Sequence, residues 1–188
     1  MKTNTHSFLT TLELNQLGFP DVGDKNVFVS RYAKFYGAEY LSLANNIRID
    51  DFCVISVGQP STIGNWVHIG TSTSIHCPIG IDIEDFAGIS PGSRIFGISN
   101  NFSDEFPMHP YLNSDLLSAS KSKISLGKFS QVGANSVVLP NSLLAEGAVL
   151  GSNSMLKTTT DPWTIYAGVP AKKISERKRI SNLPEIID

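Results

Sequence analysis

The amino-acid sequence predicts an all-β protein, folded as a left-handed parallel β-helix of about six coils, with a long loop after the fourth coil and short helical caps at both ends. The main observation is a six-residue period of aliphatic residues, which is neither the 3.6-residue period of a helix nor the two-residue period of an ordinary strand. The positions on this grid are all Leu, Ile or Val: Leu43, Ile49, Ile55, Ile63, Ile69, Ile75, Ile83, Ile89, Ile95, Leu126, Val132, Val138, Leu144, Leu150 and Leu156.

A second set of residues follows the first at a fixed distance. Four positions after most of the aliphatic residues lies a small or β-branched residue: Cys53, Val67, Thr73, Ala87, Ser93, Ser130, Ser136, Ser142, Ala148 and Ser154. A short strand that points one aliphatic and one small residue inward, followed by a tight corner of Gly or a short polar residue, explains this spacing. Three such sides close a triangular coil of roughly 18 residues, and coils stack at the ~4.8 Å spacing of strands.

The places where the grid restarts locate the insertions. The early restarts lie 20 residues apart, at Leu43, Ile63 and Ile83. Each early coil therefore carries two extra residues, which fall after its third side, near 57–60 and 77–80. The longest excursion, 96–123, also leaves after a third side. We expect all insertions to stack on one edge of the prism, and that edge is where functional residues should gather.

The chain divides into three predicted segments. Residues 1–22 form an N-terminal helical cap, because 8–17 have helical spacing. Residues 23–160 form the β-helix, including the loop, and 161–188 form a C-terminal tail in which the basic stretch 172–179 suits a short helix. A solenoid needs such covers because its end coils would otherwise expose an apolar triangle.

Composition argues against several classes of partner. A formal net charge of -2 over 188 residues gives no basic footprint for nucleic acid. No apolar run approaches the ~18 residues needed for membrane insertion, and the N-terminus does not resemble a signal peptide. Cys53 and Cys77 have neither a zinc-site nor a disulfide-framework spacing. We expect a cytoplasmic protein with reduced thiols.

Three segments carry a resemblance to a known family: IRIDDFCVIS at 47–56, FAGISPGSRIF at 86–96 and PWTIYAGVPAKKI at 162–174. With the repeat, they make the sequence similar to the hexapeptide-repeat acyltransferases, in the branch that holds galactoside and maltose O-acetyltransferases and acetyltransferases of bacterial surface polysaccharides. The resemblance implies a cytoplasmic homotrimer with active sites at its subunit interfaces. It also implies acetyl-CoA as co-substrate, no metal, and a sugar or nucleotide-sugar acceptor beside the long loop.

The resemblance indicates where the pantetheine arm of coenzyme A would bind. Gly133-Ala134 and Gly151-Ser152 occupy matching corners of the last coils, where small residues let a ligand approach the backbone. Ala134 and Ser152 match the family's pantetheine contacts. The alternative is that these residues only form the turns.

Basic residues near the C-terminus are the candidates for holding the phosphates. Lys157 and Thr158 match family positions near the phosphates of the adenine nucleotide, and Lys172 matches a basic position after the Val-Pro dipeptide. Lys173 and Arg177 follow closely enough to contribute charge-assisted hydrogen bonds. A solvated basic segment is the alternative.

The catalytic base is where the sequence departs from the family. O-acetylation needs a base to take the hydroxyl proton during attack on the thioester. The family's usual His, at the start of the loop, falls on Asn100, which cannot accept a proton near neutral pH. His76, predicted one coil below Phe96, and His109 within the loop could replace it, or could be surface residues. The candidates for binding the acceptor lie nearby in the loop: Asn101, Asp104 and Glu105.

The sequence therefore predicts acetyl-CoA-dependent acetylation of a sugar hydroxyl by direct transfer, in O-antigen or capsule biosynthesis. Because Asn100 replaces the base, N-acetylation of a nucleotide-linked amino sugar is the alternative, since an amine needs less activation. Two other classes remain: a non-catalytic β-helix scaffold, and a γ-carbonic-anhydrase-like enzyme. The second is disfavoured because such a site needs three convergent histidines.

Overall fold

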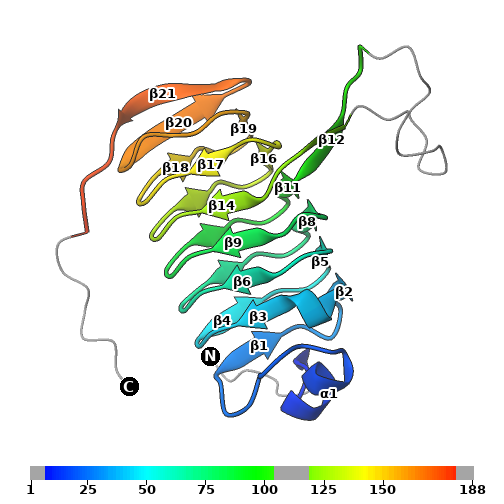
Figure 1. Cartoon of the computed structure of the whole chain (residues 1–188). Helices are drawn as coiled ribbons and strands as arrows, with labels where there is room; N and C mark the ends of the chain where they lie inside the picture. Colours follow the sequence, from blue (N-terminus) through cyan, green and yellow to red (C-terminus); the bar gives the residue numbers. More distant parts are fainter. Residues whose placement is uncertain (1–6, 104–118, 181–188) are drawn as a thin grey trace.

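The computed structural model describes residues 7–103 and 119–180. Over these residues the chain forms a left-handed parallel β-helix of about six coils (Figure 1). Each complete coil contributes one short strand to each of three parallel sheets, and these sheets are the faces of a triangular prism. The predicted fold class is confirmed. Among the described residues, no helix is long and apolar enough to cross a bilayer.

The three sheets are named here by their order along the first coil. Sheet I contains β1 (Val27–Val29), β4 (Ile47–Ile49), β7 (His68–Ile69), β10 (Gly88–Ile89), β15 (Gln131–Val132), β18 (Val149–Leu150), β20 (Thr164–Gly168) and β21 (Ala171–Glu176). Sheet II contains β2 (Lys34–Tyr36), β5 (Val54–Val57), β8 (Ser74–Cys77), β11 (Arg94–Phe96), β16 (Val137–Val138) and β19 (Met155–Leu156). Sheet III contains β3 (Leu41–Leu43), β6 (Ser61–Ile63), β9 (Ile81–Ile83), β14 (Ile124–Leu126) and β17 (Leu143–Leu144).

The core consists of aliphatic ladders that run through the coils. In sheet I, Ile49 pairs with Ile69, Ile69 with Ile89, and Ile89 with Val132. Every aliphatic residue of the predicted six-residue grid is buried. Burial of each such side chain stabilises the fold by roughly 1.5–3 kcal/mol, so the ladders supply most of the driving force for stacking the coils.

The corner between sheets II and III, called corner II/III, collects the insertions as predicted. It holds the short 3₁₀ helix η2 (Ala38–Tyr40), residues 58–60 and 78–80, and the long excursion after β11. Gly58 and Gly97 allow adjacent coils to approach closely there: a Cβ on Gly58 would lie 2.8 Å from the carbonyl oxygen of Pro78. The excursion begins and ends as an antiparallel hairpin of β12 (Ile98–Asn100) and β13 (Ala119–Lys121), which projects from the prism (Figure 1).

The other two corners contain residues with positive φ. Several are Asn, as expected for the left-handed region. At the corner between sheets III and I, called corner III/I, four positions are instead aromatic: Trp66, Phe86, Phe129 and Trp163. Their rings form a continuous stack with centroid separations of 6.4, 5.1 and 5.9 Å. Ring stacking of this kind offsets the cost of left-handed backbone in a bulky residue.

A short helix covers the first coil, as the sequence predicts. Helix α1 (Thr11–Gln16) begins with a capping box between Thr10 and Glu13. Glu13 also accepts two hydrogen bonds from Arg31, at 2.6 and 2.9 Å, which tie the helix to the first coil. These bonds lower the pKa of Glu13 to about 2. Leu14, a residue of this helix, is buried.

The predicted C-terminal helix is wrong. Residues 171–176 form β21, which runs antiparallel to β20 after the turn at Val169-Pro170 and closes the end of sheet I. The physical reason is the open sheet edge: β20 would leave its outer N–H and C=O groups unpaired, and a strand satisfies them whereas a helix does not. Trp163 is buried beside this hairpin and packs on Phe129.

Stability at corner II/III should depend on Gly37. Its φ is +81°, and a Cβ there would overlap the carbonyl oxygen of Val57 in the next coil. We expect Gly37→Ala to lower the free energy of unfolding by about 2 kcal/mol or more, measured by chemical denaturation at a fixed protein concentration. Gly23→Ala is the matched control, since the nearest atom to its Cβ would be 3.8 Å away. Equal stabilities of the two variants would contradict this account of the corner.

Candidate functional site

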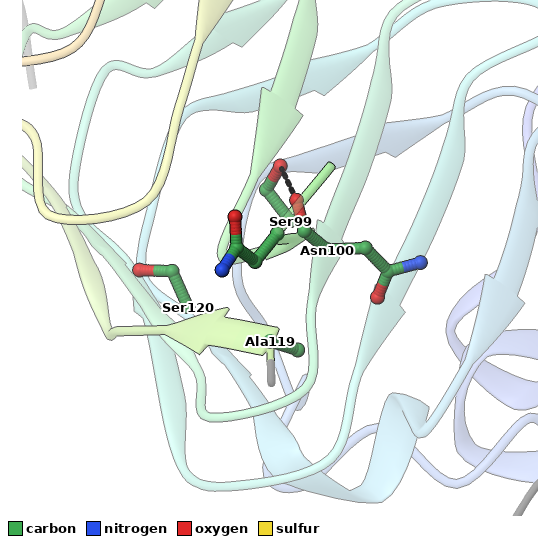
Figure 2. Close-up of a pocket in the computed structure, with 5 residues that line it drawn as sticks. Ser99, Asn100, Ala119 and Ser120 are labelled. Atoms are coloured by element: carbon green, nitrogen blue, oxygen red, sulfur yellow. Dashed lines mark hydrogen bonds between the residues drawn. The ribbon is translucent and has the colours of Figure 1, made fainter. Parts of the chain in front are cut away.

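The hairpin at corner II/III forms one side of an open hollow of about 510 Å³. Its described lining residues are Ser99 and Asn100 from β12, Asn101 directly after it, and Ala119 and Ser120 from β13 (Figure 2). Asn141, from the fifth coil, holds the hairpin in place: its side-chain amide donates to Ser120 Oγ at 2.8 Å.

The described residues that line this hollow can form hydrogen bonds but cannot transfer a proton near neutral pH. Among the described residues that line it, the polar side chains are hydroxyls and amides, none of which titrates near neutral pH. Asn100 is exposed, and the side-chain oxygen of Asn101 accepts a hydrogen bond from the backbone N–H of Ser103 at 3.1 Å. The other loop candidates, Asp104, Glu105 and His109, lie outside the described residues.

His76 lies at the base of the hairpin, one coil below Phe96, as predicted. The two rings stack with centroids 5.9 Å apart. The backbone N–H of Gly97, where the excursion begins, donates to the carbonyl oxygen of His76 at 2.8 Å. The half-buried ring is therefore fixed next to the start of the hairpin.

The neighbouring thiol is unsuited to nucleophilic attack. Cys77 is buried, and burial raises its pKa to about 12. Burial likewise raises the pKa of Cys53 to about 11. Both cysteines are therefore protonated at neutral pH, and a thiol must ionise to act as a nucleophile.

The two corners assigned to the pantetheine arm lie one above the other. The backbone N–H of Asn153 donates to the carbonyl oxygen of Ala134 at 2.9 Å, so Ala134 and Ser152 are stacked at the corner between sheets I and II, called corner I/II. A Cβ on Gly133 would lie 2.5 Å from Ser152 N, so glycine is required for this close approach. Lys157 and Thr158 are exposed and directly follow β19, so they lie at the opposite end of sheet II from this corner.

The basic residues in and directly after β21 differ from one another in their contacts. Lys172 is exposed. Lys173 pairs with Asp161 at 3.3 Å and Glu176 at 2.8 Å, which raises its pKa. Arg177 donates to the carbonyl oxygens of Phe129 and Gly147, both at 2.8 Å.

Arg177 is thus fixed at corner III/I, whereas Ala134 and Ser152 lie at corner I/II. Its guanidinium lies 5.7 Å from the centroid of the Trp163 ring, and burial lowers its pKa. The structure does not bring Arg177 together with the pantetheine candidates, and its contacts hold the aromatic stack and the C-terminal hairpin against the coil. The use of Arg177 for cofactor binding remains a prediction.

Sequence reasoning missed a second hollow, on sheet I. It measures about 340 Å³ and is lined by nine residues, among them Trp66, His68, Phe86, Gly88 and Gln131. The available signal was the presence of aromatic residues at corner positions where Gly or Asn is usual. Over the described residues, no group of three His, Cys, Asp or Glu side chains is arranged to hold a metal ion.

Comparison with known proteins identifies the family, although no family model matches the chain. The dTDP-4-amino-4,6-dideoxy-D-glucose acyltransferase of Escherichia coli is 36% identical over 174 residues, covering 92% of this chain and 90% of that protein. The putative lipopolysaccharide biosynthesis O-acetyl transferase WbbJ of Escherichia coli K12 is 29% identical over 145 residues, covering 74% and 70%.

Comparison with solved structures gives the same family. AntD, an N-acyltransferase from Bacillus cereus, superposes with a TM-score of 0.87 at 38% identity, covering 92% of this chain and 91% of that one; this structure, of a point variant, contains dTDP-4-amino-4,6-dideoxyglucose and coenzyme A. A second AntD structure, with dTDP and 3-hydroxybutyryl-CoA, has a TM-score of 0.86. Neither a scaffold nor a carbonic anhydrase is among these relatives. The chain belongs to the hexapeptide-repeat acyltransferases and is an acyl-CoA-dependent sugar acyltransferase.

Proposed function

We propose that this enzyme transfers an acyl group to the amino group of a dTDP-linked 4-amino-4,6-dideoxy sugar. The observation that carries the proposal is Asn100, because the resemblance to the O-acetyltransferase branch implies a catalytic His at this position. The neutral amine attacks the thioester carbonyl carbon, the carbon–sulfur bond breaks, and coenzyme A leaves as the thiol after taking up the proton released by nitrogen. The two relatives that cover nine-tenths of the chain, one in sequence and one in structure, act on or bind such a sugar nucleotide.

An amine fits the polar groups of the hairpin hollow better than a hydroxyl does. An amino group with a pKa near ~8 is partly neutral at cell pH and carries its own lone pair. A sugar hydroxyl stays protonated and needs a base. Ser99, Asn100 and Ser120 can orient an amine by hydrogen bonding without accepting its proton. Acetylation of a sugar hydroxyl, which the sequence analysis predicts, is the second candidate function. The similarity to WbbJ supports it.

Coenzyme A would lie along corner I/II of the last two coils. The stacked backbones at Ala134 and Ser152 offer N–H and C=O groups to an extended pantetheine arm, because no large side chain covers them. The exposed cations Lys157 and Lys172, with the hydroxyl of Thr158, would hold the phosphates. We propose acetyl as the acyl group that is transferred.

The proposed oligomeric state is a homotrimer, and the proposed location is the cytoplasm. A homotrimer would place the hairpin of one subunit beside the coils of the next, and a cytoplasmic location would supply acyl-CoA. The product, an N-acylated nucleotide sugar, suits the biosynthesis of a bacterial surface polysaccharide. Light scattering coupled to gel filtration should give three times the mass of one chain, and a monomer mass would contradict a site shared between subunits.

Acceptor preference is the direct test. Incubation with acetyl-CoA and dTDP-4-amino-4,6-dideoxyglucose should add one acetyl group, seen by mass spectrometry, while dTDP-6-deoxyglucose, which has a hydroxyl in place of the amine, should stay unmodified. The reason is that no base in the described hollow activates a hydroxyl. Comparable acetylation of both acceptors would favour the O-acetyltransferase candidate.

Substitution of His76 and of His109 tests whether a general base takes part in this mechanism. His76→Ala and His109→Ala should each keep turnover of the amine within about tenfold of the wild type, because removal of a general base usually costs 10²–10⁴-fold. A loss in that larger range for either variant, with an unchanged melting temperature, would identify the base and contradict unassisted attack.

The coenzyme A groove can be blocked at one position. Ala134→Trp places a large side chain at the half-buried corner, and we expect the dissociation constant for coenzyme A, measured by calorimetry, to rise at least about tenfold. Ser42→Trp, at an exposed position on sheet III in the first coil, is the control and should bind normally. Unchanged affinity in Ala134→Trp would place the cofactor elsewhere.

A further inference from the structure

Arg94 holds its guanidinium at corner I/II, the corner proposed for coenzyme A. It is the first residue of β11, in the fourth coil. Its Nη1 donates to the carbonyl oxygens of Ser72 and Gly92, both at 2.7 Å, and to that of Ser93 at 3.1 Å. These acceptors belong to the third and fourth coils. Because three backbone groups hold Nη1, the guanidinium is fixed in place by the protein itself.

The charge of Arg94 has no acidic partner within residues 7–103 and 119–180. By comparison, Arg31 and Arg48 each pair with a carboxylate at 2.6 Å. The side chain of Arg94 is half-buried, and its Nη2 and Nε groups donate to no described atom. A fixed, unpaired guanidinium is suited to bind an anion, or an oxygen atom that becomes negatively charged during a reaction.

Corner I/II is a continuous edge from the third coil to the sixth. One backbone hydrogen bond joins each coil to the next: Gly92 N–H donates to Thr71 O at 2.9 Å, Asn135 N–H to Pro91 O at 3.0 Å, and Asn153 N–H to Ala134 O at 2.9 Å. The coils are spaced by ~4.8 Å along this edge. The guanidinium of Arg94 therefore lies on the same edge as Ala134, at the level of the two coils directly below it.

The proposed direction of coenzyme A brings its thioester towards Arg94. The phosphates would lie with Lys157, in the sixth coil, and Lys172, in β21, and the pantetheine arm with Ser152 and Ala134. The arm then runs along corner I/II from the C-terminal end of the prism towards the fourth coil. Its sulfur end, which carries the acyl group, is the end that approaches the guanidinium.

The acceptor would arrive at the same height along the prism. Arg94 and the hairpin both belong to the fourth coil, since β11 continues through Gly97 into β12. Within one subunit they lie at opposite ends of sheet II. Rotation about an axis parallel to the prism does not change height along it. In the proposed trimer, Arg94 of one subunit is therefore level with the base of the hairpin of the next.

We propose that Arg94 stabilises the negative charge that forms on the thioester carbonyl oxygen during acyl transfer; this role rests on the function proposed above. As the amine nitrogen bonds to the carbonyl carbon, one electron pair of the C=O bond moves onto oxygen. It returns when the carbon–sulfur bond breaks, and sulfur leaves with the electron pair of that bond and takes up the proton lost by nitrogen.

A guanidinium fits this role in the absence of a base. It keeps its positive charge and has no acceptor group, so it stabilises an oxyanion without removing a proton. A donor that is already in place needs no reorganisation when the charge forms, and this makes such contacts among the largest contributions to catalysis. Arg94 would thus act on the carbonyl, while the hairpin orients the amine.

Arg94→Gln tests the role, because glutamine keeps N–H donors for the backbone carbonyls but carries no charge. With acetyl-CoA and dTDP-4-amino-4,6-dideoxyglucose, its kcat should fall about 10²–10³-fold, the usual loss when an oxyanion donor is removed. Its affinity for free coenzyme A, which lacks the carbonyl, should stay within about threefold of the wild type by calorimetry. Arg48→Gln is the matched control: it removes a guanidinium from sheet I and should keep the wild-type kcat.

Two further measurements separate contact with the carbonyl from a structural role. In infrared spectra, the carbonyl stretch of carbon-13-labelled acetyl-CoA bound to the wild type without acceptor should lie below its value in water and below its value in Arg94→Gln, because a nearby positive charge polarises the bond. Guanidinium ions added to Arg94→Ala should restore part of its kcat, whereas sodium chloride at the same concentration should not.

Each outcome decides a different point. A folded Arg94→Gln with a kcat within about threefold of the wild type would overturn the role. Tenfold weaker coenzyme A binding with kcat retained would assign Arg94 to a phosphate instead. If Arg94→Gln does not fold, the wild-type spectrum decides, and a carbonyl stretch no lower than in water would overturn the role.

The function and the role of Arg94 can fail separately. A wild type that acylates the amino sugar, with an Arg94→Gln that does so equally well, keeps the proposed function and loses only the role. Failure of the wild type to acylate the amino sugar would overturn the proposed function. The same variants with a hydroxyl acceptor would then test Arg94, since that reaction also places negative charge on the thioester oxygen.

Discussion

The structure depends on one constraint: each coil must lay its strands in register on the coil below. The backbone hydrogen bonds between coils and the aliphatic ladders both require this register, and neither tolerates an extra residue within a strand. Extra residues can therefore leave only at a corner. Because η2, residues 58–60 and 78–80 and the hairpin all lie at corner II/III, the register itself sets the position of the hairpin hollow.

This constraint explains how much of the molecule the sequence could predict. The six-residue period identifies the ladders, and counting along it places His76 below Phe96 and Ala134 next to Ser152, since register is preserved from coil to coil. The C-terminal segment lies outside the period. Its basic residues are compatible with a helix or a strand, and only the open edge of β20, a tertiary feature, decides for the strand. The ion pairs of Lys173 and the backbone contacts of Arg177 follow from that hairpin, so they could not be foreseen.

The aromatic corner shows tertiary packing overriding a local rule. Local chemistry favours Gly or Asn where φ is positive, and Asn46, Asn135 and Asn153 follow this rule. At Trp66 and Phe86 the same backbone carries rings, because each ring stacks on a ring of an adjacent coil. Gly147 leaves the corner of one coil without a ring, and Trp163 of the next coil covers Gly147 and packs on Phe129. Asn46 occupies the position one coil below Trp66, which is why the outer ring of the stack stays partly exposed.

The activation of the acceptor follows from what the register brings to the hairpin. The described groups around Asn100 can position a nucleophile but cannot take its proton, while the nearest thiol has a pKa raised to about 12. The proposed amine acceptor fits these described groups, because a neutral amine is a good nucleophile without a base whereas a hydroxyl is not. In the proposed function, catalysis would rest on holding the amine against the thioester carbonyl, a positioning effect that can by itself supply several kcal/mol of the barrier reduction. A rigid stack of coils is well suited to that task, because it would hold the coenzyme A corner of one subunit and the base of the hairpin of the next in fixed positions.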